Sequence, residues 1–142
     1  MNTLSESLRE AVIRRATNRC EYCQLPADLQ VGGFEVDHVM PRSIGGQTAL
    51  PNLALAYPHC NARKWAHTEG QDPESGQRVT LFHPRTQAWS DHCAWSEQRP
   101  FEITGIALQG RATLARLQMN HPDLVSIRRL LSALGISWRV ES

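Results

Sequence analysis

The chain has 142 residues and a formal net charge of +1, from 15 basic and 14 acidic side chains. This length suits one domain, and the near-balance of charge excludes a protein that coats nucleic acid by bulk charge. It does not exclude an enzyme that presents a few cations in one groove. No stretch approaches the roughly 18 apolar residues that span a bilayer, and the first residues do not resemble a secretory signal. We therefore expect a cytoplasmic protein without a membrane partner.

The first half of the chain predicts two helices and two strands. In chain order they are a helix at residues 3–18, a strand at 34–40, a second strand or extended segment at 52–56, and a short helix at 60–67. Apolar side chains share one face of the first helix, where Thr3 and Glu6 resemble a capping box. The first strand alternates apolar and polar residues and ends at Pro41. Gly45-Gly46 predicts a turn or a close approach of backbone.

The second half predicts an irregular segment at 78–95, a strand at 101–108, and helices at 110–119 and 122–134. Pro122 begins the last helix and Gly135 follows it, as is typical of helix ends. Its apolar residues recur at helical spacing, so we expect this stripe in the core. The stripe consists of Leu124, Ile127, Leu130, Leu131 and Leu134.

The chain contains four cysteines, Cys20, Cys23, Cys60 and Cys93, and the first two form a Cys-x-x-Cys pair. In a chain without an export signal, a Cys-x-x-Cys pair indicates a metal or redox site rather than half of a disulfide framework.

Asp37 and His38, with Asn61 further along, form a set suited to phosphodiester hydrolysis. This reaction requires a base for water and positive charge on the phosphate and the leaving oxygen. An imidazole such as His38 titrates near neutral pH, and a carboxylate such as Asp37 binds hard divalent cations. Neighbouring residues of a strand point to opposite faces, so the strand must end or distort here for both to reach one phosphate.

The ordered pattern around these residues resembles the HNH endonuclease family. The pattern is Cys20-x-x-Cys23, Asp37-His38, Gly45-Gly46, Asn52 and Cys60-Asn61-x-x-Lys64. More loosely, Asp72-Pro73-x-x-Gly76 and Leu81-Phe82-x-Pro84-Arg85 resemble segments of bacterial HNH proteins. The resemblance implies an α+β fold, with a ββα-metal core at about 18–70, an N-terminal helix, and a C-terminal strand and two-helix extension at about 71–142. Residues 1–142 would form one domain.

The resemblance also implies roles for individual residues. His38 matches the general base, and Asn52 matches the asparagine that fixes the inter-strand loop and orients the base; a plain turn residue is the alternative. Asp37 and Asn61 match the ligands of one catalytic cation, Mg²⁺ or Mn²⁺, with Ni²⁺ or Zn²⁺ as alternatives. Asn61 could instead cap its helix. Residues expected to contact nucleic acid are Lys64, Arg42 and Arg85, although Lys64 could equally be a solvated helix residue.

Many family members carry two Cys-x-x-Cys pairs that hold a structural zinc. Here Tyr57 stands where the second pair needs a cysteine, so Cys20, Cys23 and Cys60 remain as thiol ligands. His59 is the nearest candidate for a fourth ligand, with Cys93 and His67 as others. The alternative is that no zinc binds and Tyr57 packs on Cys20 and Cys23. We expect less than one tightly bound zinc per chain.

Residues 82–95 form a second candidate surface for nucleic acid, through His83, Arg85, Trp89 and His92. The alternative is that Trp89 and Trp95 hold an irregular loop on the core.

The leading hypothesis is therefore an endonuclease that cleaves duplex or nicked DNA by a one-metal mechanism with little sequence preference. The alternative is a catalytically inactive nucleic-acid-binding module with the same fold. A thiol oxidoreductase is disfavoured because the Cys20-x-x-Cys23 pair follows a helix instead of opening one. No oligomeric state is indicated.

Overall fold

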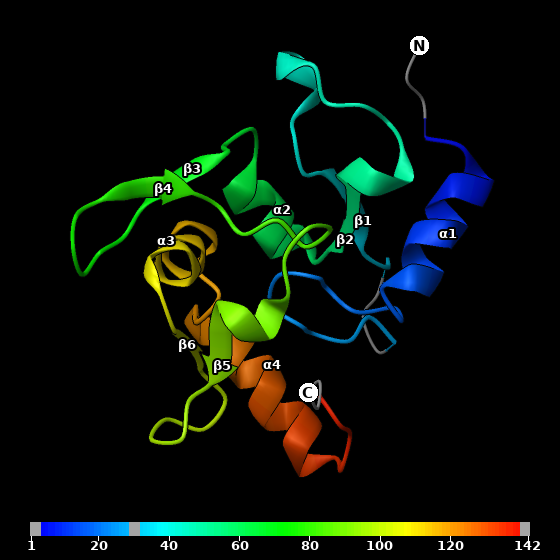
Figure 1. Ribbon diagram of the computed structural model, residues 1–142. Coiled ribbons are helices and arrows are strands. Elements are labelled where there is room, and N and C mark those ends of the chain that lie inside the picture. Colours follow the sequence, from blue (N-terminus) through cyan, green and yellow to red (C-terminus); the bar gives the residue numbers. More distant parts are fainter. Residues whose placement is uncertain (1–3, 29–31, 140–142) are drawn as a thin grey trace.

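The computed structural model describes residues 4–28 and 32–139, which form a mixed α+β fold (Figure 1). This confirms the expected fold class. The described helices are α1 (Glu6–Arg15), α2 (Pro58–Lys64), α3 (Leu108–Leu117) and α4 (Pro122–Ala133). The described strands are β1 (Glu35–His38), β2 (Leu53–Ala56), β3 (Glu69–Gln71), β4 (Arg78–Thr80), β5 (Cys93–Trp95) and β6 (Ile103–Gly105). They pair as three antiparallel hairpin-like sheets, β1–β2, β3–β4 and β5–β6. None of the described helices has the length and apolarity to cross a membrane.

The β1–β2 pair and α2 form the ββα unit that the pattern predicts. His38 stands opposite Leu53, and all four residues of β2 are buried. Helix α2 begins directly after β2 at Pro58, which suits a first helical turn because its missing N–H would have no partner there. Strand β1 ends at His38, two residues before the predicted end.

Two consecutive glycines, Gly45 and Gly46, allow the tight turn in the loop between β1 and β2. Gly45 has φ +97°, a left-handed conformation that favours glycine. A Cβ on Gly46 would lie 1.7 Å from the carbonyl oxygen of Met40, so only glycine fits. Both expectations for this pair, a turn and a close backbone approach, are confirmed.

Helix α1 begins later than expected. Ser5 is the N-cap, and its Oγ accepts a hydrogen bond from the backbone N–H of Leu8. The predicted capping box is therefore wrong in its cap residue, and Thr3 itself lies outside the described residues. Arg15, in the last turn, donates to the carbonyl oxygens of Leu50 and Leu53 and so ties α1 to β2.

Residues 78–95 are more regular than expected, because they contain β4, a 3-10 turn at Trp89–Asp91 and β5. The turn between β3 and β4 is organised by Asp72, which is fully buried. Its carboxylate accepts from the backbone of Glu74 and Ser75 and, through both oxygens, from the guanidinium of Arg111 on α3. The Arg111 guanidinium holds the pKa of the Asp72 carboxyl well below its usual range.

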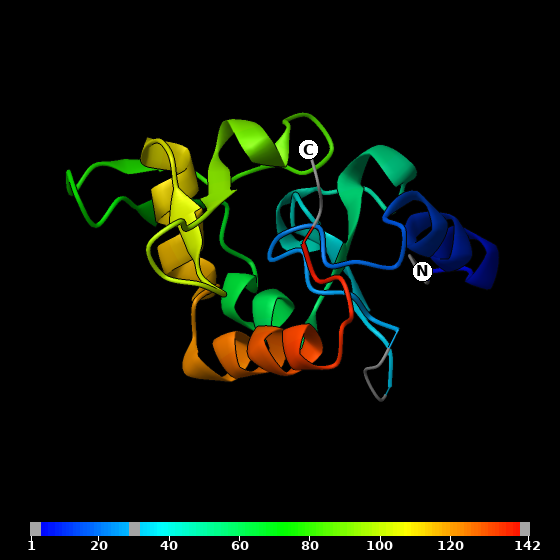
Figure 2. The ribbon, with the colours of Figure 1, turned by 90° about the horizontal axis from the view of Figure 1, so that it is seen from below.

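The apolar stripe predicted for α4 is only partly in the core. Leu124 and Leu131 are buried, whereas Leu130 and Leu134 are exposed. The reason is that α4, which lies beside α2 in Figure 2, also buries the side chain of Arg128. A buried guanidinium needs hydrogen-bond partners, and the position of α4 that provides them turns the outer leucines toward solvent.

Candidate active site

Four of the residues expected to act in catalysis or substrate binding line one open pocket of about 400 Å³. Asp37 and His38 come from β1, Arg42 from the following loop, and Asn61 from α2. Glu35 and Trp65, which the sequence pattern did not single out, line the same pocket.

Asp37 is the buried member of this set, with 4% of its surface exposed. Its Oδ2 accepts a hydrogen bond of 2.6 Å from the hydroxyl of Tyr22 and lies 3.1 Å from Nζ of Lys64. Burial and the Asp37 carboxylate raise the pKa of Tyr22 well above its ordinary value, which keeps the hydroxyl protonated as a donor. Tyr22 therefore joins the Cys20-x-x-Cys23 turn directly to the candidate metal ligand.

The position of Lys64 corrects the expectation that it faces phosphate or solvent. Only 1% of Lys64 is exposed. Its ammonium points inward and donates to the carboxylate of Asp37 and to the carbonyl oxygens of His38 and Val39. A buried carboxylate requires a counter-charge, and Lys64 supplies it at the end of α2.

His38 is partly buried, and its Nε2 lies 2.9 Å from Oγ1 of Thr48 in the inter-strand loop. Burial, followed by the positive charge of Arg42, lowers the pKa of His38, while Asp37 acts in the opposite direction. The imidazole is thus neutral at physiological pH and able to accept a proton. Since β1 ends at His38, both Asp37 and His38 reach the pocket although they leave the strand on opposite faces.

Asn52 lies across the inter-strand loop and makes three side-chain hydrogen bonds there. Its Oδ1 accepts from the backbone N–H of Met40, and its Nδ2 donates to the carbonyl oxygens of Met40 and Gln47. Its own carbonyl oxygen accepts from Val39. This is the loop-fixing position that was expected, and an effect on the base stays a prediction.

Asn61 faces the pocket from the second turn of α2. Tyr57 is the N-cap of that helix, so the alternative in which Asn61 caps it is wrong. The Nδ2 of Asn61 donates to Oε1 of Glu35 at 2.9 Å. That contact turns the amide so that its Oδ1, to which no described residue donates, is available as an oxygen ligand.

The donors in the pocket fit a hard divalent cation. Asp37 and Asn61 contribute a carboxylate oxygen and an amide oxygen, and Mg²⁺ takes such ligands in small number, completing its shell with water and phosphate oxygens. Of the three residues expected to contact nucleic acid, Arg42 is the one that lines this pocket, and its side chain is exposed.

Arg85 lies elsewhere, which corrects its expected place on a nucleic-acid surface. It forms a largely buried ion pair with Glu21. Glu21 is itself buried and accepts from the backbone N–H of Leu55 on β2 through Oε2, so its second oxygen needs a cation. Burial, with a smaller contribution from Arg15, lowers the pKa of Arg85 to about 10.

In the segment 82–95, the two tryptophans Trp89 and Trp95 pack inward, as in the alternative in which they hold this segment on the core. The indole N–H of Trp89 donates to the carbonyl oxygen of Tyr22 at 2.8 Å, and its ring lies 5.5 Å from that of Trp95. These contacts hold the loop on the core.

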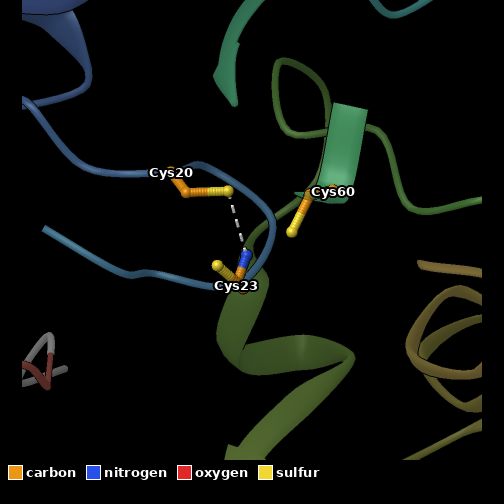
Figure 3. A group of neighbouring side chains, drawn as sticks. All are labelled: Cys20, Cys23 and Cys60. Atoms are coloured by element: carbon orange, nitrogen blue, oxygen red, sulfur yellow. Dashed lines mark hydrogen bonds between the residues drawn. The ribbon is translucent and has the colours of Figure 1, made fainter. Parts of the chain in front are cut away.

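Three thiols converge from the Cys20-x-x-Cys23 turn and from Cys60 in α2 (Figure 3). Their sulfur atoms all lie within 4.8 Å of one another, so the cluster could hold a metal ion. Burial opposes ionisation of Cys20, but hydrogen bonds from the other two thiols and from the backbone of Tyr57 and Cys23 outweigh it and lower its pKa well below the ordinary value. Burial raises the pKa of Cys23, and hydrogen bonds to its two partners raise that of Cys60.

No fourth protein ligand completes this group among the described residues. The candidate His59 turns away, with Nε2 3.1 Å from the carbonyl oxygen of Leu117 and 2.9 Å from that of Gln118. Because His59 and Cys60 are adjacent residues of α2, their side chains leave the helix in different directions. The ring of Tyr57 packs edge-on against Phe34 at 5.2 Å.

Arg128 of α4 fills the space beside the thiols. Its guanidinium donates to the carbonyl oxygens of Phe101 and Met119, each at 2.8 Å. The group also contacts Cys23, and its Nε has no hydrogen-bond partner among the described residues. A buried positive charge therefore stands against a cluster of sulfur ligands.

Sequence reasoning missed five residues of the two sites. They are Tyr22, Glu35, Thr48, Trp65 and Arg128. Glu35 had a readable signal, because it lies two residues before Asp37 on the same face of a strand. The others are brought in by contacts between distant segments or by the turn after α2.

Comparison with known proteins supports the pattern. Residues 20–66 match the model of the HNH endonuclease family, which confirms the resemblance over the segment that carries the motif. The chain is also 23% identical over 126 residues to the Septu protein PtuB of Bacillus thuringiensis, an alignment that covers 87% of this chain. It covers 45% of PtuB, so the chain spans less than half the length of that relative. No solved structure matches the chain.

Replacing Tyr22 by phenylalanine removes the only hydroxyl that donates to Asp37 among the described residues. We expect Mg²⁺-dependent activity or metal affinity to fall by about 10–100-fold, as is usual when a partner of a metal ligand is lost. Cleavage rates over a Mg²⁺ titration measure this. Tyr57→Phe is the control, because the hydroxyl of Tyr57 makes no hydrogen bond to a described residue. Equal activity of Y22F and wild type would contradict a positioning role.

Replacing Lys64 by alanine leaves the buried Asp37 carboxylate without its cation. We expect the free energy of unfolding to fall by about 3–5 kcal/mol, the cost of breaking a buried pair from one side. Arg42→Ala, which also removes one positive charge but from an exposed position, should change it by no more than about 0.5 kcal/mol. Urea unfolding of both variants is the measurement, and similar losses in the two would show that Lys64 is not an internal counter-charge.

Proposed function

We propose that this protein is a metal-dependent endonuclease that hydrolyses DNA phosphodiester bonds with His38 as general base. One observation carries the proposal: an imidazole, a carboxylate and an amide oxygen from two elements of the ββα unit line one open pocket. The match of residues 20–66 to the HNH endonuclease family supports the same chemistry.

His38 accepts the proton of the attacking water. Its contact with Thr48 fixes the ring, and a proton on Nε2 that is donated to Thr48 leaves Nδ1 free to act as the base. The loop bearing Thr48 is held in turn by Asn52, whose amide bonds to Met40 near the start of the loop and to Gln47 beside Thr48. The base is therefore oriented by the inter-strand loop.

Asp37 and Asn61 are the residues that would hold the divalent cation, Mg²⁺ or Mn²⁺, with Ni²⁺ or Zn²⁺ as alternatives. When bound, the cation supplies positive charge to the scissile phosphate and to the leaving oxygen. Arg42, exposed on the same pocket wall, binds a non-bridging phosphate oxygen or a neighbouring phosphate. One pocket of this composition in the described part of the chain favours cleavage of one strand at a time.

We further propose that the thiol cluster holds a structural Zn²⁺ with Arg128 as its charge partner. Cysteine sulfur is the preferred donor for zinc, whose structural sites have four ligands. Three thiolates and one Zn²⁺ leave one net negative charge, which is costly in a buried site unless it is balanced. The guanidinium of Arg128 cancels it, and α4 thereby becomes part of the site. With three protein ligands, binding is weaker than in a four-cysteine site.

The nuclease proposal is tested by incubating supercoiled plasmid with Mg²⁺, Mn²⁺ or Ni²⁺. We expect wild-type protein to nick it and His38→Ala to lose at least about 100-fold in rate, the lower range for a general base. Because the pKa of His38 is lowered, the neutral base persists to lower pH. The rising limb of kcat/KM against pH should therefore lie below the ordinary histidine value.

Two outcomes contradict this proposal. Equal nicking by wild type and His38→Ala would assign the activity to a contaminant. Salt-sensitive DNA binding without cleavage in any of the metals would favour an inactive binding module instead.

The zinc proposal is tested by metal content after treatment with a mild chelator. We expect less than one zinc per wild-type chain, and a value close to one in Tyr57→Cys, because the new thiol completes a second Cys-x-x-Cys pair. Arg128→Met should retain less zinc than wild type, whereas Arg128→Lys, which keeps the charge, should retain more than Arg128→Met. Cys93→Ala, a buried cysteine outside the cluster, is the control.

Wild-type protein that keeps one zinc per chain through chelation would contradict the weak three-thiolate site. Unchanged zinc content in Arg128→Met would contradict the role of the guanidinium. Thermal unfolding with and without added zinc separates loss of metal from loss of fold, since zinc raises Tm only in proteins that still bind it.

A further inference from the structure

Trp65 is the most exposed large hydrophobic residue of the described chain, with 74% of its surface accessible. It follows Lys64 at the end of α2 and lines the same pocket as Asp37 and His38. The other three tryptophans are buried or half-buried. An apolar indole in water is unfavourable, so the placement of this one beside the candidate catalytic residues calls for a physical reason.

The backbone of Trp65 adds to the cost. Its φ is +45° and its ψ is −124°, in a region that side chains with a Cβ rarely adopt. Its N–H closes the helix by bonding to the carbonyl oxygen of Asn61. The ring makes one aromatic contact in the described structure, edge-to-face with His67 at 5.9 Å. Packing within the chain does not offset the free-energy cost of the exposed indole or of its backbone conformation. Contact with a ligand in the pocket would offset both.

The neighbours of Trp65 indicate the chemistry of that ligand. The pocket wall offers Arg42 for a phosphate and Asp37 with Asn61 for a cation that would bind the same phosphate. A flat apolar surface next to phosphate-binding groups suits a nucleotide, whose base can stack on the indole while its phosphate meets the cation. Lys64, the cation nearest in sequence, is turned inward and cannot share this task.

We propose that Trp65 is a stacking platform for an unpaired base of the substrate strand, next to the phosphodiester that is cleaved. Bases inside an intact duplex present only their edges, because both faces are covered by neighbouring pairs. A ring that stacks on a base face therefore selects a nucleotide that is single-stranded, frayed or at a nick or gap. This inference rests on the proposed nuclease function and narrows its substrate to strands with unpaired bases. Stacking is tolerant of sequence, because every base has such a face.

Binding is measured with the His38→Ala protein, which holds substrate without cutting it, and three DNA ligands: a single strand, a gapped duplex and an intact duplex. Adding Trp65→Ala should weaken binding of the single strand and the gapped duplex by about 5–150-fold, the range for loss of one stacked base. Trp65→Phe should keep most of the affinity. Ile44→Ala is the matched control, since Ile44 is 61% exposed on the neighbouring loop but does not line the pocket.

Cleavage by the active protein locates the stacked base. An abasic position beside the cleaved bond should slow wild-type protein to the rate of Trp65→Ala, and should not slow Trp65→Ala further. Such non-additivity is expected when the substitution and the missing base remove the same contact. An abasic position several nucleotides away should affect neither protein.

The outcomes separate this inference from the proposed function. If nicking depends on His38 while Trp65→Ala binds and cleaves normally, the stacking platform is wrong and the nuclease stands. If no metal supports cleavage but Trp65 governs binding of single strands, the nuclease is wrong, and Trp65 stacks on unpaired bases in a binding module instead of beside a cleaved bond. An equal loss for intact duplex and single strand would overturn the selection of unpaired bases.

Discussion

The structure depends on one buried carboxylate, that of Asp37. A carboxylate with 4% of its surface exposed is stable only if charge and hydrogen bonds compensate its lost hydration. Two segments distant in sequence provide this compensation, Tyr22 from the cysteine turn and Lys64 from α2. Strand, turn and helix are therefore fixed relative to one another by a single side chain, and that side chain is also the candidate ligand of the catalytic cation.

This arrangement links the thiol cluster to the candidate active-site pocket. Tyr22 lies between Cys20 and Cys23, so any ion that orders the cysteine turn also sets the position of the hydroxyl on Asp37. On the other side of the cluster, Arg128 connects the thiols to the backbone of Phe101 and Met119. Helix α4 thus supports the ββα unit through the thiol cluster, although it contributes no residue to the pocket.

The order of elements in the ββα unit could be predicted because it rests on local signals: Pro41 after the first strand, the Gly45-Gly46 turn, and fixed spacing of motif residues. The start of α2 was placed two residues too late because the signal of Pro58 was not used. The orientation of long side chains could not be predicted. Whether Lys64 faces solvent or the core depends on which face of a seven-residue helix meets β1, and the sequence period does not specify this over so few residues. Arg85 was misassigned because its partner, Glu21, is far away along the chain. In α4 the apolar stripe was predicted to lie in the core as a whole. Arg128 occupies part of the buried face of this helix, so Leu130 and Leu134 are exposed.

The inward turn of Lys64 changes how a nucleic acid can be held. With that cation used inside the protein, and with Arg85 paired to Glu21, Arg42 is the cation of the predicted nucleic-acid set that still lines the pocket. Affinity from phosphate contacts grows with the number of cations that face the strand, so one arginine gives little of it. The remaining candidates at this pocket are the cation proposed for Asp37 and Asn61, and the exposed ring of Trp65. Both would act over a few ångströms on one nucleotide, so recognition in the proposed function is local to the cleaved bond and does not depend on a large net positive charge, which the chain lacks.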